Sequence, residues 1–118
     1  MAQTPEAKVK KRIIAILHWY GAYHFYPVTG GYGRSGVPDI VVCWKGKFIG
    51  IECKANGNTL TALQMKNLRD IANNAGVAIS VDESGVNSFA LLLAKWNEEG
   101  LPSGGYLGEL TKNAQQTE

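Results

Sequence analysis

The stretch 36-GVPDIVVCWKGKFIGIECKANG-57 decides the fold of this chain, because it contains two apolar, β-branched runs around a short turn. The runs cover residues 38–44 and 47–54, and Lys45-Gly46 lies between them, a pattern that predicts a β-hairpin. An aspartate and a glutamate interrupt these runs. Buried carboxylates destabilise a fold unless something compensates them, so the two acids need an explanation.

The turn determines which residues of the hairpin face one another. With a two-residue turn, Trp44 faces Lys47, and the same register places Asp39 opposite Glu52, with Lys54 on their face. Opposed residues have Cβ atoms about 4.5–5.5 Å apart, where like charges repel. A divalent cation between two carboxylates turns repulsion into ligation, and oxygen ligands suit Mg²⁺ or Mn²⁺. A three-residue loop would instead shift the register and separate the acids.

The rest of the sequence predicts one α/β domain at 1–100, a mixed β-sheet flanked by helices in the order α-β-β-β-α-β-α. Residues 101–118 are polar and glycine-rich, and we expect a flexible tail there. The expected elements outside the hairpin are a helix from Pro5 to about Gly21, an edge strand at 23–28, a helix from Thr61 to Gly76, a strand at 77–81 and a helix from Ser88 to Glu98.

Charge is distributed unevenly along the chain. Residues 1–69 contain ten lysines and arginines but three acids, and from residue 70 onward acids predominate. A basic half favours a polyanionic partner, usually nucleic acid, although a solvated basic surface explains the same lysines. Two of those three acids are the facing carboxylates of the hairpin, and this favours the nucleic-acid interpretation.

The sequence contains neither a membrane-spanning segment nor a secretory signal, and this bears on localisation. No apolar run approaches the roughly 20 residues that cross a bilayer, and the N-terminus has no secretory signal pattern. We therefore expect a cytoplasmic protein without a membrane partner, with Cys43 and Cys53 reduced. Neither cysteine has a partner at zinc-ligand spacing.

The motif residues resemble those of the PD-(D/E)XK nucleases. Gly36-Val-Pro-Asp39 is followed by Glu52-Cys-Lys54 on the next strand and by Gln64 on the following helix. More narrowly, this pattern is similar to that of the VRR-NUC group, G-x-P-D…E-x-K…Q. The resemblance covers about Thr4 to Val81 and implies a restriction-endonuclease-like fold.

The resemblance also implies a metal-dependent endodeoxyribonuclease, which hydrolyses phosphodiester bonds. Lys54 would orient or deprotonate the attacking water, and Gln64 would position the lysine or the scissile phosphate. The implied ligands of one or two Mg²⁺ (or Mn²⁺) ions are Glu6, Asp39, Glu52 and the backbone carbonyl of Cys53. No organic cofactor is expected.

Several of these residues have simpler explanations. Glu6 can act by favouring a helix N-terminus electrostatically, and Gln64 can complete a capping box with Thr61. The candidate DNA-binding residues, which an ordinary solvated or packed surface also explains, are Lys8, Lys11, Arg12, Tyr32 and Arg34. Tyr32 would stack on a base and the cations would contact phosphates.

The resemblance also implies a substrate and an oligomeric state. Stand-alone members of the family resemble homodimeric Holliday-junction resolvases, so we expect a homodimer that cuts branched or otherwise structured DNA. One alternative is a nicking or restriction-like endonuclease that needs partner proteins. Another is a non-catalytic DNA-binding protein on a nuclease fold, although the intact acids and lysine argue against it.

Overall fold

The computed structural model describes residues 3–28 and 33–112, which form one mixed sheet and three helices. Its elements in chain order are α1 (Pro5–Trp19), β1 (Tyr23–Phe25), β2 (Ile40–Trp44), β3 (Lys47–Cys53), α2 (Ala62–Asn73), β4 (Val77–Val81), α3 (Val86–Glu99) and β5 (Tyr106–Leu110).

The strands lie in the order β1-β2-β3-β4-β5. The first three pair antiparallel, whereas β3, β4 and β5 run parallel to one another. In the β2–β3 hairpin Trp44 pairs with Lys47 and Ile40 pairs with Ile51. The predicted hairpin register is therefore confirmed. Continued by one residue, it places Asp39 opposite Glu52.

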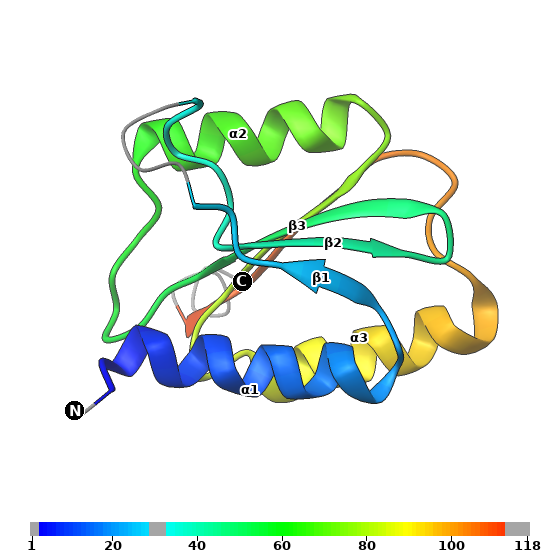
Figure 1. Ribbon diagram of the computed structural model, residues 1–118, viewed down its shortest axis with the longest axis horizontal. Helices are drawn as coiled ribbons and strands as arrows, with labels where there is room; N and C mark the ends of the chain where they lie inside the picture. Colours follow the sequence, from blue (N-terminus) through cyan, green and yellow to red (C-terminus); the bar gives the residue numbers. More distant parts are fainter. Residues whose placement is uncertain (1–2, 29–32, 113–118) are drawn as a thin grey trace.

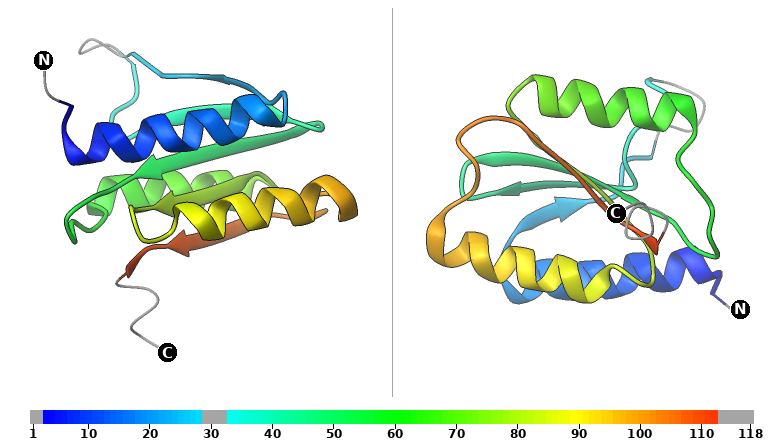
Figure 2. Two further views of the ribbon diagram at one scale, coloured as in Figure 1. Left: turned by 90° about the horizontal axis from the view of Figure 1, so that it is seen from below. Right: turned by 180° about the vertical axis from the view of Figure 1, so that it is seen from behind.

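Two helical layers enclose the sheet. Helices α1 and α3 lie side by side on one face, and α2 lies on the other (Figures 1 and 2). The α1 helix begins where the sequence predicts, because the Thr4 hydroxyl accepts a hydrogen bond from the Ala7 N–H at 3.1 Å and Pro5 occupies the first turn.

The main core lies between the sheet and the α1/α3 layer. Alternate residues of β2 and β3 point into it, as the period of a β-strand requires. The side chains buried there from the central strands include Ile40, Val42, Ile49, Ile51, Val77, Ile79 and Val81. The remaining residues of β2 and β3 face the α2 side of the sheet, and the candidate acids belong to that side.

One segment of the expected flexible tail, residues 101–118, is a β-strand in the structure. Tyr106–Leu110 forms β5, which extends the sheet beside β4. The Tyr106 ring packs edge-on against Trp96, with centroids 5.1 Å apart. The buried carboxylate of Asp82 accepts hydrogen bonds from the N–H groups of Ser84 and Lys112, each at 2.9 Å, which fixes the chain after β5. The pairing with β4 and the bond from Lys112 to Asp82 join segments about 30 residues apart, so a glycine-rich composition does not reveal them.

Two further features concern the cysteines and the helices. Cys43 and Cys53, both within the described ranges, are free cysteines. In the part of the chain that the structure describes, no helix is both long enough and apolar enough to cross a membrane.

Candidate active site

The site lies where β2 begins and β3 ends. Asp39 immediately precedes β2, and Glu52 is the penultimate residue of β3. The Asp39 carboxylate accepts a hydrogen bond from the backbone N–H of Cys53, with 2.8 Å between Oδ2 and N. This bond fastens the start of β2 to the end of β3 and brings the two predicted carboxylates together.

Glu52 is buried, with 2% of its surface exposed, and its Oε2 atom has no hydrogen-bond partner among the described residues. Burial, a hydrogen bond with Asp39 and the negative charge of Asp39 raise the pKa of Glu52 to about 9, although the positive charge of Lys54 opposes the shift. The pair therefore holds a proton at neutral pH unless a cation replaces it.

Lys54 follows Glu52 by two residues and is itself largely buried. Its backbone N–H donates to the Val81 carbonyl at 2.9 Å, which continues the pairing with β4 past the end of β3. The Cys53 thiol between them is fully buried, and burial together with the Asp39 charge raises its pKa far above the ordinary value. Cys53 therefore offers the site its backbone groups and not a thiolate.

A close approach over Gly50 positions Asp39. A Cβ atom on Gly50 would lie 2.8 Å from the Pro38 ring and 2.6 Å from the Ile71 side chain of α2. The missing side chain therefore lets Pro38 lie directly on β3. Because Asp39 is the next residue, this contact fixes the position of the Asp39 backbone, from which the carboxylate extends.

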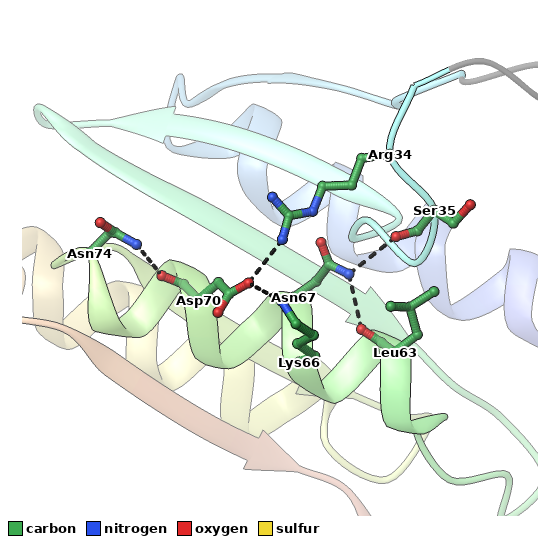
Figure 3. A network of polar contacts seen from close by, with 7 residues as sticks. All are labelled: Arg34, Ser35, Leu63, Lys66, Asn67, Asp70 and Asn74. Carbon is green, nitrogen blue, oxygen red and sulfur yellow. Dashed lines mark hydrogen bonds and ion pairs between the residues drawn. The ribbon is translucent and has the colours of Figure 1, made fainter.

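The loop before Asp39 is tied to α2 by Asn67, which the sequence analysis did not single out. Asn67 is buried, and its Nδ2 donates to the Ser35 carbonyl at 3.2 Å and to the Leu63 carbonyl at 2.9 Å (Figure 3). Gly36 has φ +74° and a Cβ there would lie 2.6 Å from Leu63. A sequence signal for Asn67 exists, because it lies four residues from both Leu63 and Ile71 on the sheet-facing side of the helix.

Arg34 has a partner in the same network. Its guanidinium donates to Asp70 at 2.9 Å, and Lys66 reaches the same carboxylate oxygen at 3.0 Å (Figure 3). The hydrogen bond from Lys66, together with the charges of Lys66 and Arg34, lowers the pKa of Asp70 below its ordinary value. The predicted DNA-binding arginine thus helps to hold the loop to α2, and its role toward DNA stays a prediction.

The predicted third acid is less closely joined to the pair. Glu6 lies in the first turn of α1 and contributes a small part of the upward shift in the pKa of Glu52. Within residues 3–28 and 33–112, no three His, Cys, Asp or Glu side chains are arranged so that they could hold a metal ion. The ligand role of Glu6 therefore stays a prediction.

Gln64 makes the capping box that the sequence predicts. Its Oε1 accepts from the Thr61 N–H at 3.0 Å, and the Thr61 hydroxyl accepts from the Gln64 N–H at 3.1 Å. These contacts account for the start of α2, and a catalytic role of Gln64 remains a separate prediction. The predicted cations of α1, Lys8, Lys11 and Arg12, are exposed. Tyr32 lies outside the described residues.

Ser80 is a second residue that the sequence analysis missed. It pairs with Glu52 across β3 and β4, so the two side chains point to the same face. Ser80 is 1% exposed, and its Oγ, like Oε2 of Glu52, lacks a hydrogen-bond partner among the described residues. A single hydroxyl inside the buried strand VAISV is the signal that could have revealed it.

The comparisons with known proteins bear on the fold. A solved VRR_NUC domain protein has a similar structure, with a TM-score of 0.55 and 14% sequence identity, over 90% of this chain and 95% of the other. No protein-family model matches the sequence, and no curated protein matches it. The similarity confirms the predicted mixed sheet flanked by helices and agrees with the resemblance drawn from the motif residues.

Proposed function

We propose that this chain is a divalent-metal-dependent endodeoxyribonuclease that acts on branched or otherwise structured DNA as a homodimer. The observation that carries the proposal is the pair of carboxylates at the ends of β2 and β3. The pair is joined through the backbone of Cys53 and followed closely by a lysine. A purely structural role gives no reason to bury a carboxylate beside another acid.

The residues of the pair fit a small divalent cation. Mg²⁺ is commonly bound through one or two carboxylates together with water and substrate phosphates, so Asp39 and Glu52 suffice as side-chain ligands. The Oε2 atom of Glu52 has no hydrogen-bond partner among the described residues, so it would be available as an oxygen ligand once the cation displaces the proton of the pair. When bound, the cation would lower the pKa of a water nucleophile and offset charge on the phosphate. The Cys53 carbonyl and Glu6 would complete the proposed ligand set.

Lys54 would supply a positive charge and a hydrogen-bond donor, which the two carboxylates cannot. Its ammonium would donate a hydrogen bond to the attacking water and offset the negative charge that grows on the phosphate. Two observations support this role: the residue is largely buried, and its positive charge lowers the pKa of Glu52. The exposed cations of α1, Lys8, Lys11 and Arg12, would contact the DNA backbone.

The test is cleavage of a panel of labelled DNAs that contains a four-way junction, a flap, a nicked duplex, a plain duplex and a single strand. Each is incubated with Mg²⁺, Mn²⁺ or EDTA, and Lys54→Ala is run beside the wild type. Metal-dependent cutting that Lys54→Ala loses supports the nuclease. A preference for the four-way junction, together with a dimeric mass in light scattering, supports the resolvase-like substrate and assembly. A preference for nicking plain duplex supports the partner-dependent endonuclease instead.

A second candidate is a non-catalytic DNA-binding protein on the same fold. The observation that favours it is that no three-acid metal cluster is formed within the described ranges. Binding of the DNA panel without cleavage of any member, under either metal, would support this candidate and contradict the nuclease.

A further inference from the structure

A groove runs along the α2 side of the sheet, next to the candidate active site. It consists of two adjoining hollows, of about 380 Å³ and about 370 Å³. Each is within the ~300–1,000 Å³ that small-molecule sites occupy. The residues that line both hollows are Arg34, Phe48, Asn67 and Ile71. The two hollows therefore adjoin each other along these four residues.

One end of the groove is adjacent in sequence to the candidate active site. Pro38 lines the larger hollow, and the residue after it is Asp39. Consecutive Cα atoms are about 3.8 Å apart, so the backbone of Asp39 lies directly beside a residue that lines this hollow.

The floor of the groove is a part of the sheet that carries half-exposed aromatic side chains. Phe25 pairs with Val41, and Tyr23 and Phe48 both pair with Cys43, so these side chains share one face. Phe25 is 47% exposed and Phe48 is 49% exposed. Exposed aromatic rings on a strand surface are the platform on which proteins stack unpaired bases.

The polar lining of the groove suits a nucleotide. Two side-chain amides, from Asn67 and Asn74, lie along the α2 wall. The described charged residues that line the hollows are Arg34 and Asp70, which form an ion pair with each other. Lys66 of α2, outside the lining, pairs with the same carboxylate, so the three residues together give this wall one excess positive charge. Its charge is therefore complementary to a polyanion and not to a basic peptide.

We propose that this groove binds unpaired nucleotides of the DNA substrate, with bases stacked on Phe25 and Phe48 and the scissile phosphate directed toward Asp39. The inference rests on the proposed nuclease function and deepens it, because it names a substrate that has a single-stranded segment beside the cleavage point. It also assigns the selection of branched DNA to a surface next to the acids and not to the acids themselves.

The experiment compares two fluorescent probes of about 12 nucleotides, a length within the site sizes known for single-strand binders. One is oligodeoxythymidine, and the other has the same phosphates with abasic spacers. Affinities are measured by anisotropy in EDTA. We expect the wild type to prefer the probe with bases by about tenfold or more, since each stacked base contributes about 1–3 kcal/mol.

The variants Phe25→Leu and Phe48→Leu keep an apolar side chain, so they retain packing but remove the stacking ring. We expect each to lower the affinity for oligodeoxythymidine about tenfold and to leave the affinity for the abasic probe unchanged. Trp19→Leu is the matched control, because Trp19 is an exposed aromatic on α1, across the sheet from the groove. Thermal melts confirm that all three variants are folded.

The outcomes separate the groove from the nuclease. Equal affinity of the wild type for both probes, or an equal loss in Trp19→Leu, overturns the inference even if the wild type cuts DNA. A change of oligomeric state in Phe48→Leu with unchanged oligonucleotide affinity also overturns it and assigns the groove to a protein interface. A selective loss in the phenylalanine variants supports the groove, including the case in which no DNA is cut and the proposed nuclease function fails.

Discussion

The Asp39 carboxylate accepts a 2.8 Å hydrogen bond from the backbone N–H of Cys53, the residue that separates Glu52 from Lys54. One bond therefore joins both halves of the sequence motif through the main chain. The side chain of Asp39 has two tasks, because it ties β2 to β3 and places negative charge beside Glu52. The two tasks can be separated by substitution.

Asp39→Asn keeps an oxygen acceptor for the Cys53 N–H but removes the charge. We expect it to lower cleavage by about a hundredfold or more, the scale on which loss of one electrostatic stabiliser acts. Its stability without metal should stay within about 1 kcal/mol of the wild type, because the asparagine oxygen can still accept from the Cys53 N–H and the proton held by the pair already offsets the repulsion between the carboxylates. Asp39→Ala also loses the acceptor and should cost about 1–3 kcal/mol in urea unfolding. Equal destabilisation by both variants would show that the charge itself supports the fold.

Glu52 should make the metal-free protein less stable as the pH rises. Its pKa is about 9 in the folded chain against an ordinary value of 4.5. Between these values the folded state binds more protons than the unfolded state. The contribution is therefore complete below pH 4.5 and is lost as the pH rises toward 9, by up to about 1.4 kcal/mol per pH unit. Urea unfolding from pH 5 to 9 measures this slope, and Glu52→Gln should flatten it.

Added Mg²⁺ should oppose that loss. At pH 8 the cation competes with the proton held by Glu52, so binding should release protons and raise the midpoint of thermal unfolding. At pH 5 the same concentration should have a smaller effect. Calorimetry in two buffers of different ionisation enthalpy measures the released protons. If Glu52→Gln shows the same stabilisation by Mg²⁺ as the wild type, the cation binds elsewhere.

Sequence reasoning reached the parts of the site that local rules determine. The Lys45-Gly46 turn fixes the pairing of Trp44 with Lys47, and the strand period then places the acids on one face. The capping box of α2 follows equally from two neighbouring residues, Thr61 and Gln64.

Sequence reasoning failed where distant segments decide. The segment Tyr106–Leu110 is weak as an isolated strand, since it contains a glycine and a glutamate, and pairing with β4 compensates for its low propensity. Ser80 and Asn67 are ordinary polar residues in the sequence, and they become notable because the sheet and α2 bury them beside the motif. Burial of that kind depends on tertiary contacts and not on spacing.

Gly50→Ala should displace the start of β2. The added Cβ would meet Pro38 and Ile71 at less than 3 Å, and overpacking of this kind costs about 1–3 kcal/mol. We expect reduced stability together with reduced affinity for Mg²⁺, because Pro38 moves Asp39 with it. Gly104→Ala is the matched control, since a Cβ there meets no atom within 4 Å. A stable Gly50→Ala protein with wild-type affinity for Mg²⁺ would contradict this account of how Asp39 is positioned.

Asn67→Ala should loosen the loop that precedes the site. The change removes the donor to the Ser35 carbonyl, and we expect a loss of about 1–3 kcal/mol in urea unfolding. Cleavage should fall by roughly 10–100-fold, as for residues that orient metal ligands. Asn73→Ala is the control, because Asn73 is exposed in the last turn of the same helix and is not among the residues that line the groove. Equal effects of the two variants would assign both asparagines to helix stability alone.

Ser80→Ala should separate the stability of the metal-free protein from its affinity for metal. The Ser80 hydroxyl is buried without a partner among the described residues, so its removal should leave the metal-free protein equally stable or about 1 kcal/mol more stable. If the hydroxyl donates to Glu52 once that carboxylate is ionised, the affinity for Mg²⁺ should nevertheless fall several-fold in titration calorimetry. Ser84→Ala is the matched control, because the Ser84 hydroxyl donates to Asp82 at 2.6 Å. That control should lose stability and keep its Mg²⁺ affinity, and the opposite pattern in the two variants would remove Ser80 from the site.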